Sequence, residues 1–185
     1  LAHANGMKLH LDGARLFNAA AALGVPASDL ASPADSVTFC LSKGLCAPVG
    51  SVLCGSAEFI RTARRIRKQL GGGMRQAGVL GAAGLVALEQ MTERLSEDHR
   101  RAQALAAGLS RIPGLVLDTE HPASNMVFAN LAAGVTDSAA QVVERLRQQG
   151  VRVGAVGARR FRMVTHYWIT DEGVERAVKA FGGAF

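Results

Sequence analysis

The chain has 185 residues, of which 49% are hydrophobic and 19% are charged, and its formal net charge is +6. This composition excludes a disordered chain and allows a domain, or a domain and a half, with a buried core. No apolar run reaches the ~18 residues of a membrane span, so we expect no membrane partner. Leucine at position 1 suggests a fragment that begins inside a domain, and no signal peptide opens the chain.

The positive charge raises nucleic acid as a partner class. The excess gathers in one segment, which holds Arg61, Arg64, Arg65, Arg67 and Lys68. Apolar residues recur at helical spacing in the same segment, so the basic residues form the solvated side of an amphipathic helix. One Trp and one Tyr in the whole chain provide too few rings for base stacking. We therefore expect no nucleic-acid partner.

The cysteines suggest a reducing compartment. Cys40, Cys46 and Cys54 are odd in number and have neither paired spacing nor nearby histidines. This pattern favours reduced cytoplasmic thiols over disulfides or a zinc site, so we expect a cytoplasmic protein without a metal.

The first half of the chain alternates short apolar strands with amphipathic helices, which is typical of an α/β fold. Strands are expected over 7–11, 37–41 and 51–54, and helices over 14–23, 57–70 and 76–91, with a short helical piece around 29–30. In the last helix Gly78, Gly81 and Gly84 are three residues apart, so one face is nearly smooth. Such a face suits close helix packing within a subunit or between subunits.

The second half predicts a smaller unit of mixed composition. A charged helix is expected over 93–109, strands over 115–117, 125–130, 151–153 and 162–165, and helices over 138–149 and 171–181. We expect a domain boundary within 92–112, carried by a helix and not by a flexible linker. The expected domains are therefore residues 1–95, and a small α+β domain over residues 96–185.

Two strand ends present residues that suit chemistry. Lys43 follows the second expected strand, and Asp12 ends the first, with Arg15 close behind. Ligands of α/β sheets lie at the carboxyl ends of strands. There a lysine can form a Schiff base with the aldehyde of pyridoxal phosphate, and a carboxylate can keep the ring nitrogen protonated. The alternatives are a solvated loop lysine for Lys43 and a helix cap for Asp12.

The blocks HLDGARLFNAA, SVTFCLSKGLCAPVGSVLCGS, RKQLGGGMRQAGVLGAAG, SNMVF and RMVTH resemble those of the low-specificity threonine aldolases in order and spacing. These are fold-type-I pyridoxal-phosphate enzymes of the β-eliminating lyase group. The resemblance runs from residue 1 to about residue 170. It implies the C-terminal portion of such a chain: part of the large cofactor-binding domain over residues 1–95, and the small domain after it.

The resemblance also implies roles for single residues. Lys43 matches the lysine that bonds covalently to the cofactor, Asp12 the partner of the ring nitrogen, and Arg15 the partner of the ring oxygen. Arg75 matches an arginine that reaches a cofactor phosphate or the substrate, in its own or the neighbouring subunit. Arg162 matches the arginine that binds the substrate α-carboxylate, a task that suits the guanidinium fork.

The two arginine assignments outside the strand ends, Arg75 and Arg162, each have an alternative explanation or a competing residue. Arg75 also suits an exposed position at a helix start, and Lys68, a weaker phosphate candidate, suits the basic helix face. Arg159 and Arg160 lie close enough to Arg162 to compete for its role. His166 follows a strand and suits a surface position better than the role of a base.

The activity implied by the resemblance is retro-aldol cleavage of threonine or allo-threonine to glycine and an aldehyde. It implies a small amino-acid substrate and a homo-oligomer, a dimer or a tetramer. Another pyridoxal-phosphate-dependent lyase or aminotransferase, or an inactive remnant that only oligomerises, stays open. The family's stacking histidine and phosphate loop have no counterpart in these residues, so we expect weak or absent activity from the chain alone.

Overall fold

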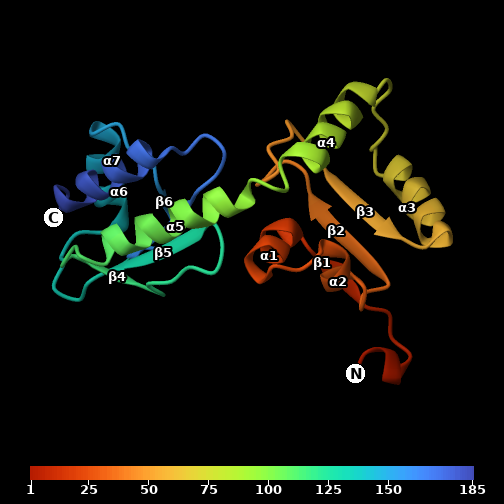
Figure 1. Ribbon diagram of the computed structural model, residues 1–185, viewed down its shortest axis with the longest axis horizontal. Coiled ribbons are helices and arrows are strands. Elements are labelled where there is room, and N and C mark those ends of the chain that lie inside the picture. Colours follow the sequence, from red (N-terminus) through yellow and green to blue (C-terminus); the bar gives the residue numbers. More distant parts are fainter. The chain divides into compact units, whose positions relative to one another are not determined.

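The computed structural model describes residues 1–185 and divides them into two compact units, Leu1–Leu95 and Ser96–Phe185. Each unit has its own sheet (Figure 1). Each also has its own cluster of buried apolar residues. No helix in the chain has both the length and the apolar character that crossing a bilayer demands.

The first unit is built on a three-stranded sheet of order β1-β2-β3. Its elements are η1 (His3–Asn5), β1 (His10–Asp12), α1 (Leu16–Leu23), α2 (Ala27–Ala31), β2 (Ser36–Cys40), β3 (Ser51–Gly55), α3 (Ala57–Gln69) and α4 (Gly78–Gln90). β1 and β2 are parallel, and β3 returns antiparallel to β2. Parallel neighbours need a crossover, which α1 and α2 provide. The carboxyl ends of β1 and β2 therefore open at the same edge.

The first unit buries few of its apolar residues. Its buried cluster consists of Leu45, Ala47, Ala87 and Leu95. α3 has no buried residue at all, although its sequence pattern is amphipathic. α4 is apolar nearly throughout, yet only two of its residues, both small, are buried. The apolar sides of both helices therefore stay open within this unit.

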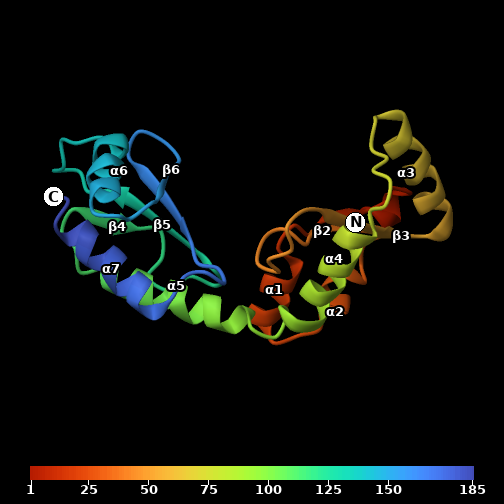
Figure 2. The same cartoon turned by 90° about the horizontal axis from the view of Figure 1, so that it is seen from above.

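The second unit is a four-stranded antiparallel sheet of order β4-β5-β7-β6. Its elements are α5 (Leu95–Leu109), β4 (Leu115–Leu117), β5 (Met126–Leu131), α6 (Ala139–Gln148), β6 (Gly154–Ala155), β7 (Arg160–Val164) and α7 (Asp171–Gly182). Alternate residues of β5 and β7, among them Val127 and Phe161, join all three helices in one buried cluster. The helices therefore cover one face of the sheet, and α5 and α7 lie side by side (Figure 2).

The strand expected over 151–153 is wrong. Gly150 has a φ of 75° and lets the chain turn back, so that the Val151 N–H donates to the Leu146 carbonyl at 2.9 Å. Val151 is then buried in the core, and strand pairing begins only at Gly154. The apolar run that looked like a strand closes α6 and fills the core instead. The other expected elements are present, with their ends shifted by a few residues.

Candidate functional site

Asp12 is the last residue of β1, and its side chain is exposed. It lies opposite Thr38 of β2, and the next residue extends the pairing, because the Gly13 N–H donates to the Thr38 carbonyl at 2.7 Å. Asp12 Oδ1 accepts a hydrogen bond from the Ala14 N–H at 3.2 Å. The carboxylate is thus held at the sheet edge. It does not cap α1, whose N-cap residue is Arg15.

Lys43 lies in the loop that follows β2, with its side chain exposed. The Leu41 and Ser42 N–H groups both donate to the Gly50 carbonyl, at 3.0 and 3.3 Å. The Cys46 N–H donates to the Lys43 carbonyl at 3.0 Å. These bonds fold the loop into a compact turn with Lys43 on its outside. These hydrogen bonds therefore define the backbone conformation of the loop at Lys43.

The lysine loop is packed against α1 at Gly44. A Cβ built on Gly44 would lie 2.8 Å from Asn18 Oδ1 and 3.1 Å from Leu95 Cδ2, so any other residue here would have to displace these side chains. Asn18 is 3% exposed. Sequence reasoning missed Asn18, although it is the one amide in an otherwise apolar helix. Its contact with Gly44 fixes the backbone next to Lys43.

Arg15 precedes α1 and is half-buried, three residues after Asp12. The structure therefore brings Asp12, Arg15 and Lys43 to the carboxyl edge of the parallel strands. Arg75 lies elsewhere in this unit, in the turn before α4, with an exposed side chain that forms no hydrogen bond or ion pair. Lys68, its weaker competitor, stays on exposed α3.

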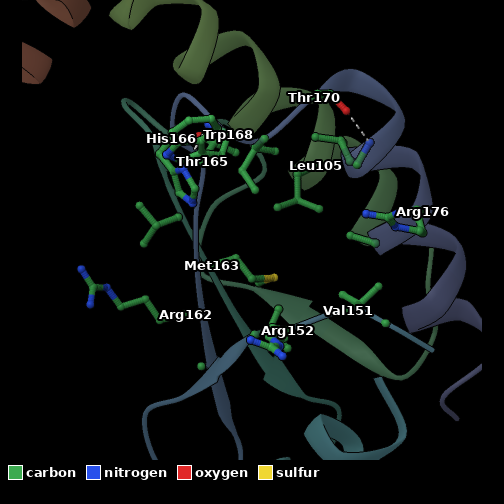
Figure 3. Close-up of a pocket in the computed structure, with 18 residues that line it drawn as sticks. Leu105, Val151, Arg152, Arg162, Met163, Thr165, His166, Trp168, Thr170 and Arg176 are labelled. Atoms are coloured by element: carbon green, nitrogen blue, oxygen red, sulfur yellow. Dashed lines mark hydrogen bonds between the residues drawn. The ribbon is translucent and has the colours of Figure 1, made fainter. Parts of the chain in front are cut away.

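Arg162 belongs to the second unit, in the middle of β7, with its side chain exposed. Its guanidinium donates a weak hydrogen bond to the Met126 sulfur, at 3.7 Å. Arg162 borders a hollow of about 550 Å³ whose rim also holds His166 and Trp168 (Figure 3).

Arg159 and Arg160, which compete with Arg162 for the carboxylate role, both have oxygen partners within the protein. Arg159 donates to the carbonyls of Ala132 and Val135, at 2.8 and 3.0 Å. Arg160 pairs with Asp118 and lies over the Phe128 ring, 4.8 Å from its centroid. Among the three neighbouring arginines, only Arg162 is left without an oxygen partner. His166 organises the turn after β7, because its Nδ1 and its carbonyl accept backbone N–H groups.

The donor set at the first sheet edge suits an organic ligand. The amine of Lys43 can react with a carbonyl carbon. The carboxylate of Asp12 can accept a hydrogen bond from a protonated ring nitrogen, and the guanidinium of Arg15 can pair with an anionic ring oxygen. No group of three or more His, Cys, Asp or Glu side chains in the chain is arranged to hold a metal ion.

The comparisons with a family model and with curated sequences agree on one family. A family model described as beta-eliminating lyase matches residues 1–132. The chain is 45% identical over 181 residues to low-specificity L-threonine aldolase 1 of Arabidopsis thaliana. That alignment covers 98% of this chain and 51% of the relative, so the chain spans about half the length of the curated relatives it matches.

Solved structures show the same architecture. A putative L-allo-threonine aldolase from Listeria monocytogenes matches with a TM-score of 0.82 at 21% identity, over 100% of this chain and 54% of that chain. The structure of SPT with its PLP internal aldimine matches with a TM-score of 0.73 at 20% identity, over 99% and 48%. At these identities the likeness concerns the fold, and it confirms the expected α/β, fold-type-I class.

Proposed function

The chain belongs to the beta-eliminating lyase family, and on that premise we propose that it carries part of the site of a pyridoxal-phosphate-dependent threonine aldolase. The reaction is retro-aldol cleavage of threonine, allo-threonine or another β-hydroxy-α-amino acid to glycine and an aldehyde. The observation that carries the proposal is the parallel pairing of β1 with β2, which brings Asp12 and Lys43 to one edge. The 45% identity to an Arabidopsis threonine aldolase supports the reaction type.

The residues at this edge fit pyridoxal phosphate. Lys43 offers an exposed amine to the aldehyde, Asp12 a carboxylate to the ring nitrogen, and Arg15 a guanidinium to the ring oxygen. When bound, the cofactor supplies an electron sink for the substrate carbon at which the bond breaks. The packed contact between Gly44 and Asn18 keeps the Lys43 backbone in place while its side chain moves.

Three further assignments complete the proposal. With a cofactor bound, the Lys43 Nζ would be placed to donate a proton to the substrate α-carbon that has lost its bond to the β-carbon. Arg162 holds the α-carboxylate with its guanidinium fork. Arg75 pairs with the cofactor phosphate, in its own or a neighbouring subunit. Residues 1–95 then form part of the cofactor-binding large domain, and residues 96–185 form the small domain.

We also propose that the protein assembles as a homo-oligomer through α4. Val79 and Leu85 on this helix are 69% and 61% exposed, and a Cβ on Gly81 would touch nothing within 4 Å. Exposed apolar surface of this kind marks interaction sites. A Leu85→Glu change is expected to shift the protein to monomers in analytical ultracentrifugation, and Gln90→Glu on the same helix is the control. A wild-type protein that is already monomeric would contradict this assembly.

The decisive experiment is Lys43→Ala, with Lys179→Ala on α7 as the control for loss of an exposed lysine. In the full-length protein, we expect Lys43→Ala to abolish borohydride fixation of the cofactor and to lower acetaldehyde release from threonine by about 100-fold or more. Lys179→Ala is expected to change neither. Fixation at another lysine would overturn the assignment of Lys43. Keto-acid formation in place of acetaldehyde would favour an aminotransferase, and oligomers without fixation would favour an inactive remnant.

A further inference from the structure

The hollow in the second unit lies at the edge where β6 begins, between β7 and α7. Its floor is apolar and includes Leu105 and Val151 (Figure 3). Val174 also lines it. Trp168, the only tryptophan of the chain, stands at the rim and is 76% exposed. A hollow of about 550 Å³ falls within the size range of small-molecule sites.

The charge of this hollow has one sign. Arg152, Arg162 and Arg176 line it, and no Asp or Glu does. Elsewhere in this unit the arginines find oxygen partners: Arg100, Arg101, Arg145, Arg147 and Arg160 pair with carboxylates, and Arg159 donates to carbonyls. Apart from Arg111, the arginines without an oxygen partner are the three that line the hollow. Positive charges gathered in a concave site attract anions.

The rim of the hollow is held in place by hydrogen bonds. Thr165 is buried, and its hydroxyl donates to the Asp98 carbonyl at 2.6 Å. The Asn125 side-chain amide donates to the Thr165 carbonyl at 2.7 Å. Beyond this point the Ile169 N–H donates to the His166 carbonyl at 2.8 Å. The site is therefore shaped before a ligand arrives, which lowers the ordering cost of binding.

We propose that this hollow binds a small organic anion: Arg152 and Arg176 pair with its carboxylate or phosphate, and the apolar floor contacts its body. Figure 3 shows Arg176 reaching from α7 toward the side of Leu105 and Val151, whereas Arg162 points the opposite way. The anion site is thus distinct from the α-carboxylate role of Arg162. It goes beyond the proposed aldolase function and does not depend on Lys43.

Binding is tested by calorimetry and by Trp168 fluorescence with three phenyl compounds: phenyl phosphate, phenylacetate and neutral 2-phenylethanol. Inorganic phosphate serves as the anion without an apolar body. We expect saturable binding of at least one phenyl anion, tighter than that of either 2-phenylethanol or inorganic phosphate. Comparing the two anions decides between phosphate and carboxylate. Absence of saturable binding by both, or equal binding of the neutral compound, overturns the proposal.

Variants locate the site. Arg152→Gln and Arg176→Gln are each expected to weaken binding about tenfold or more, the scale of a lost hydrogen bond to a charged group. Arg152→Lys, which keeps the charge but loses the fork, is expected to weaken it less. Arg111→Gln removes an unpaired arginine outside the hollow and is expected to change binding less than twofold. Near-UV circular dichroism checks that each variant is folded.

Two outcomes would place the anion elsewhere and overturn the proposal. One is a loss of binding in Arg162→Gln without a loss in Arg152→Gln and Arg176→Gln, which would place the anion at the position proposed for the substrate α-carboxylate. The other is a loss of binding in Lys43→Ala, which would place the anion at the first sheet edge. Failure of the aldolase function itself would leave phenyl-anion binding intact, so the two proposals fail separately.

Discussion

The two units are nearly equal in length, but they differ in how completely each buries its own apolar residues. The second unit gathers nineteen buried residues in one cluster, and the first gathers four. In the second unit, helices cover one face of a four-stranded sheet. In the first, α3 buries nothing and α4 leaves large side chains open. The second unit therefore has a self-contained core, whereas the first offers surface for other protein to cover.

The units also divide the proposed chemistry unequally. The first carries Asp12, Arg15, Lys43 and Arg75, and the second carries Arg162. The residues proposed to hold the cofactor thus lie in the unit with the thinner core. Its local geometry is nevertheless well defined, because hydrogen bonds and one tight glycine contact hold the lysine loop. Local order at a site does not require a large core around it.

The largest stability effect is expected from truncating a matched aromatic ring in each unit. Phe161 is fully buried and meets Phe181 edge to face at 5.6 Å, whereas Phe39 meets Phe17 at 5.2 Å but is only half-buried. Phe161→Ala is expected to cost about 3–5 kcal/mol of unfolding free energy, and Phe39→Ala clearly less. Hydrogen exchange measured separately over the two units reports each loss. Equal losses would mean that other protein covers Phe39.

A smaller effect is expected at the lysine loop. Gly44→Ala places a Cβ against Asn18 and Leu95, and we expect it to cost about 1–3 kcal/mol of unfolding free energy. Because the strain falls beside Lys43, turnover is expected to drop as well. Thermal unfolding and threonine cleavage measure the two losses.

The matched test of this contact is the double variant Gly44→Ala with Asn18→Ala. Removing Oδ1 opens the space that the new Cβ needs, so the double variant is expected to regain part of the turnover relative to Gly44→Ala. If the double variant is no better than Gly44→Ala, the contact with Asn18 does not position the lysine.

Much of the fold could be predicted because local patterns and tertiary structure agree. The helix ending at Gly24 closes with a φ of 67°, as glycine allows, and the capping box of Ser138 and Gln141 begins α6 where the apolar period begins. The prediction failed at 151–153, because period-2 alternation cannot tell a strand from a segment that fills a core. Only the tertiary contact of Val151 decides between them.

The candidate site also combines residues that could be predicted from the sequence with residues that could not. Asp12 and Lys43 could be singled out because each follows an apolar strand, and the structure pairs those two strands in parallel. Asn18 could not be singled out from the sequence, because its role depends on a contact with Gly44, which is distant in the sequence. The hollow in the second unit could not be predicted from the sequence either. Its arginines come from the loop before β6, from β7 and from α7, and their lack of carboxylate partners is visible only in the folded chain.

A smaller change still is expected on α4, where two glycines three residues apart face different surroundings. A Cβ on Gly81 touches nothing within 4 Å, whereas one on Gly84 lies 3.0 Å from Leu41 Cδ1. Gly81→Ala is expected to stabilise the first unit by roughly 0.5–1 kcal/mol, because alanine favours the helix. Gly84→Ala is expected to gain less, or to lose stability, because Leu41 must move. Thermal unfolding and ultracentrifugation together show whether Gly81→Ala destabilises the oligomer, which would place α4 in the subunit interface.

The smallest effect is expected from an ion-pair network of the second unit, and it depends on pH. Hydrogen bonds from Arg100 and Arg101 hold the pKa of Asp171 below its ordinary value of 3.8, which ties α5 to α7. Because the folded-state pKa is lowered, this stabilisation is complete above the unfolded-state pKa and is lost as pH falls through the folded-state pKa. Asp171→Asn is therefore expected to lower the Tm of the second unit slightly near neutral pH and not at the acid end of the profile. Glu175→Gln, which removes a carboxylate without an ion pair from the same helix, is the control. A Tm difference for Asp171→Asn that stays constant across the pH range would show that the carboxylate charge does not stabilise the contact between α5 and α7.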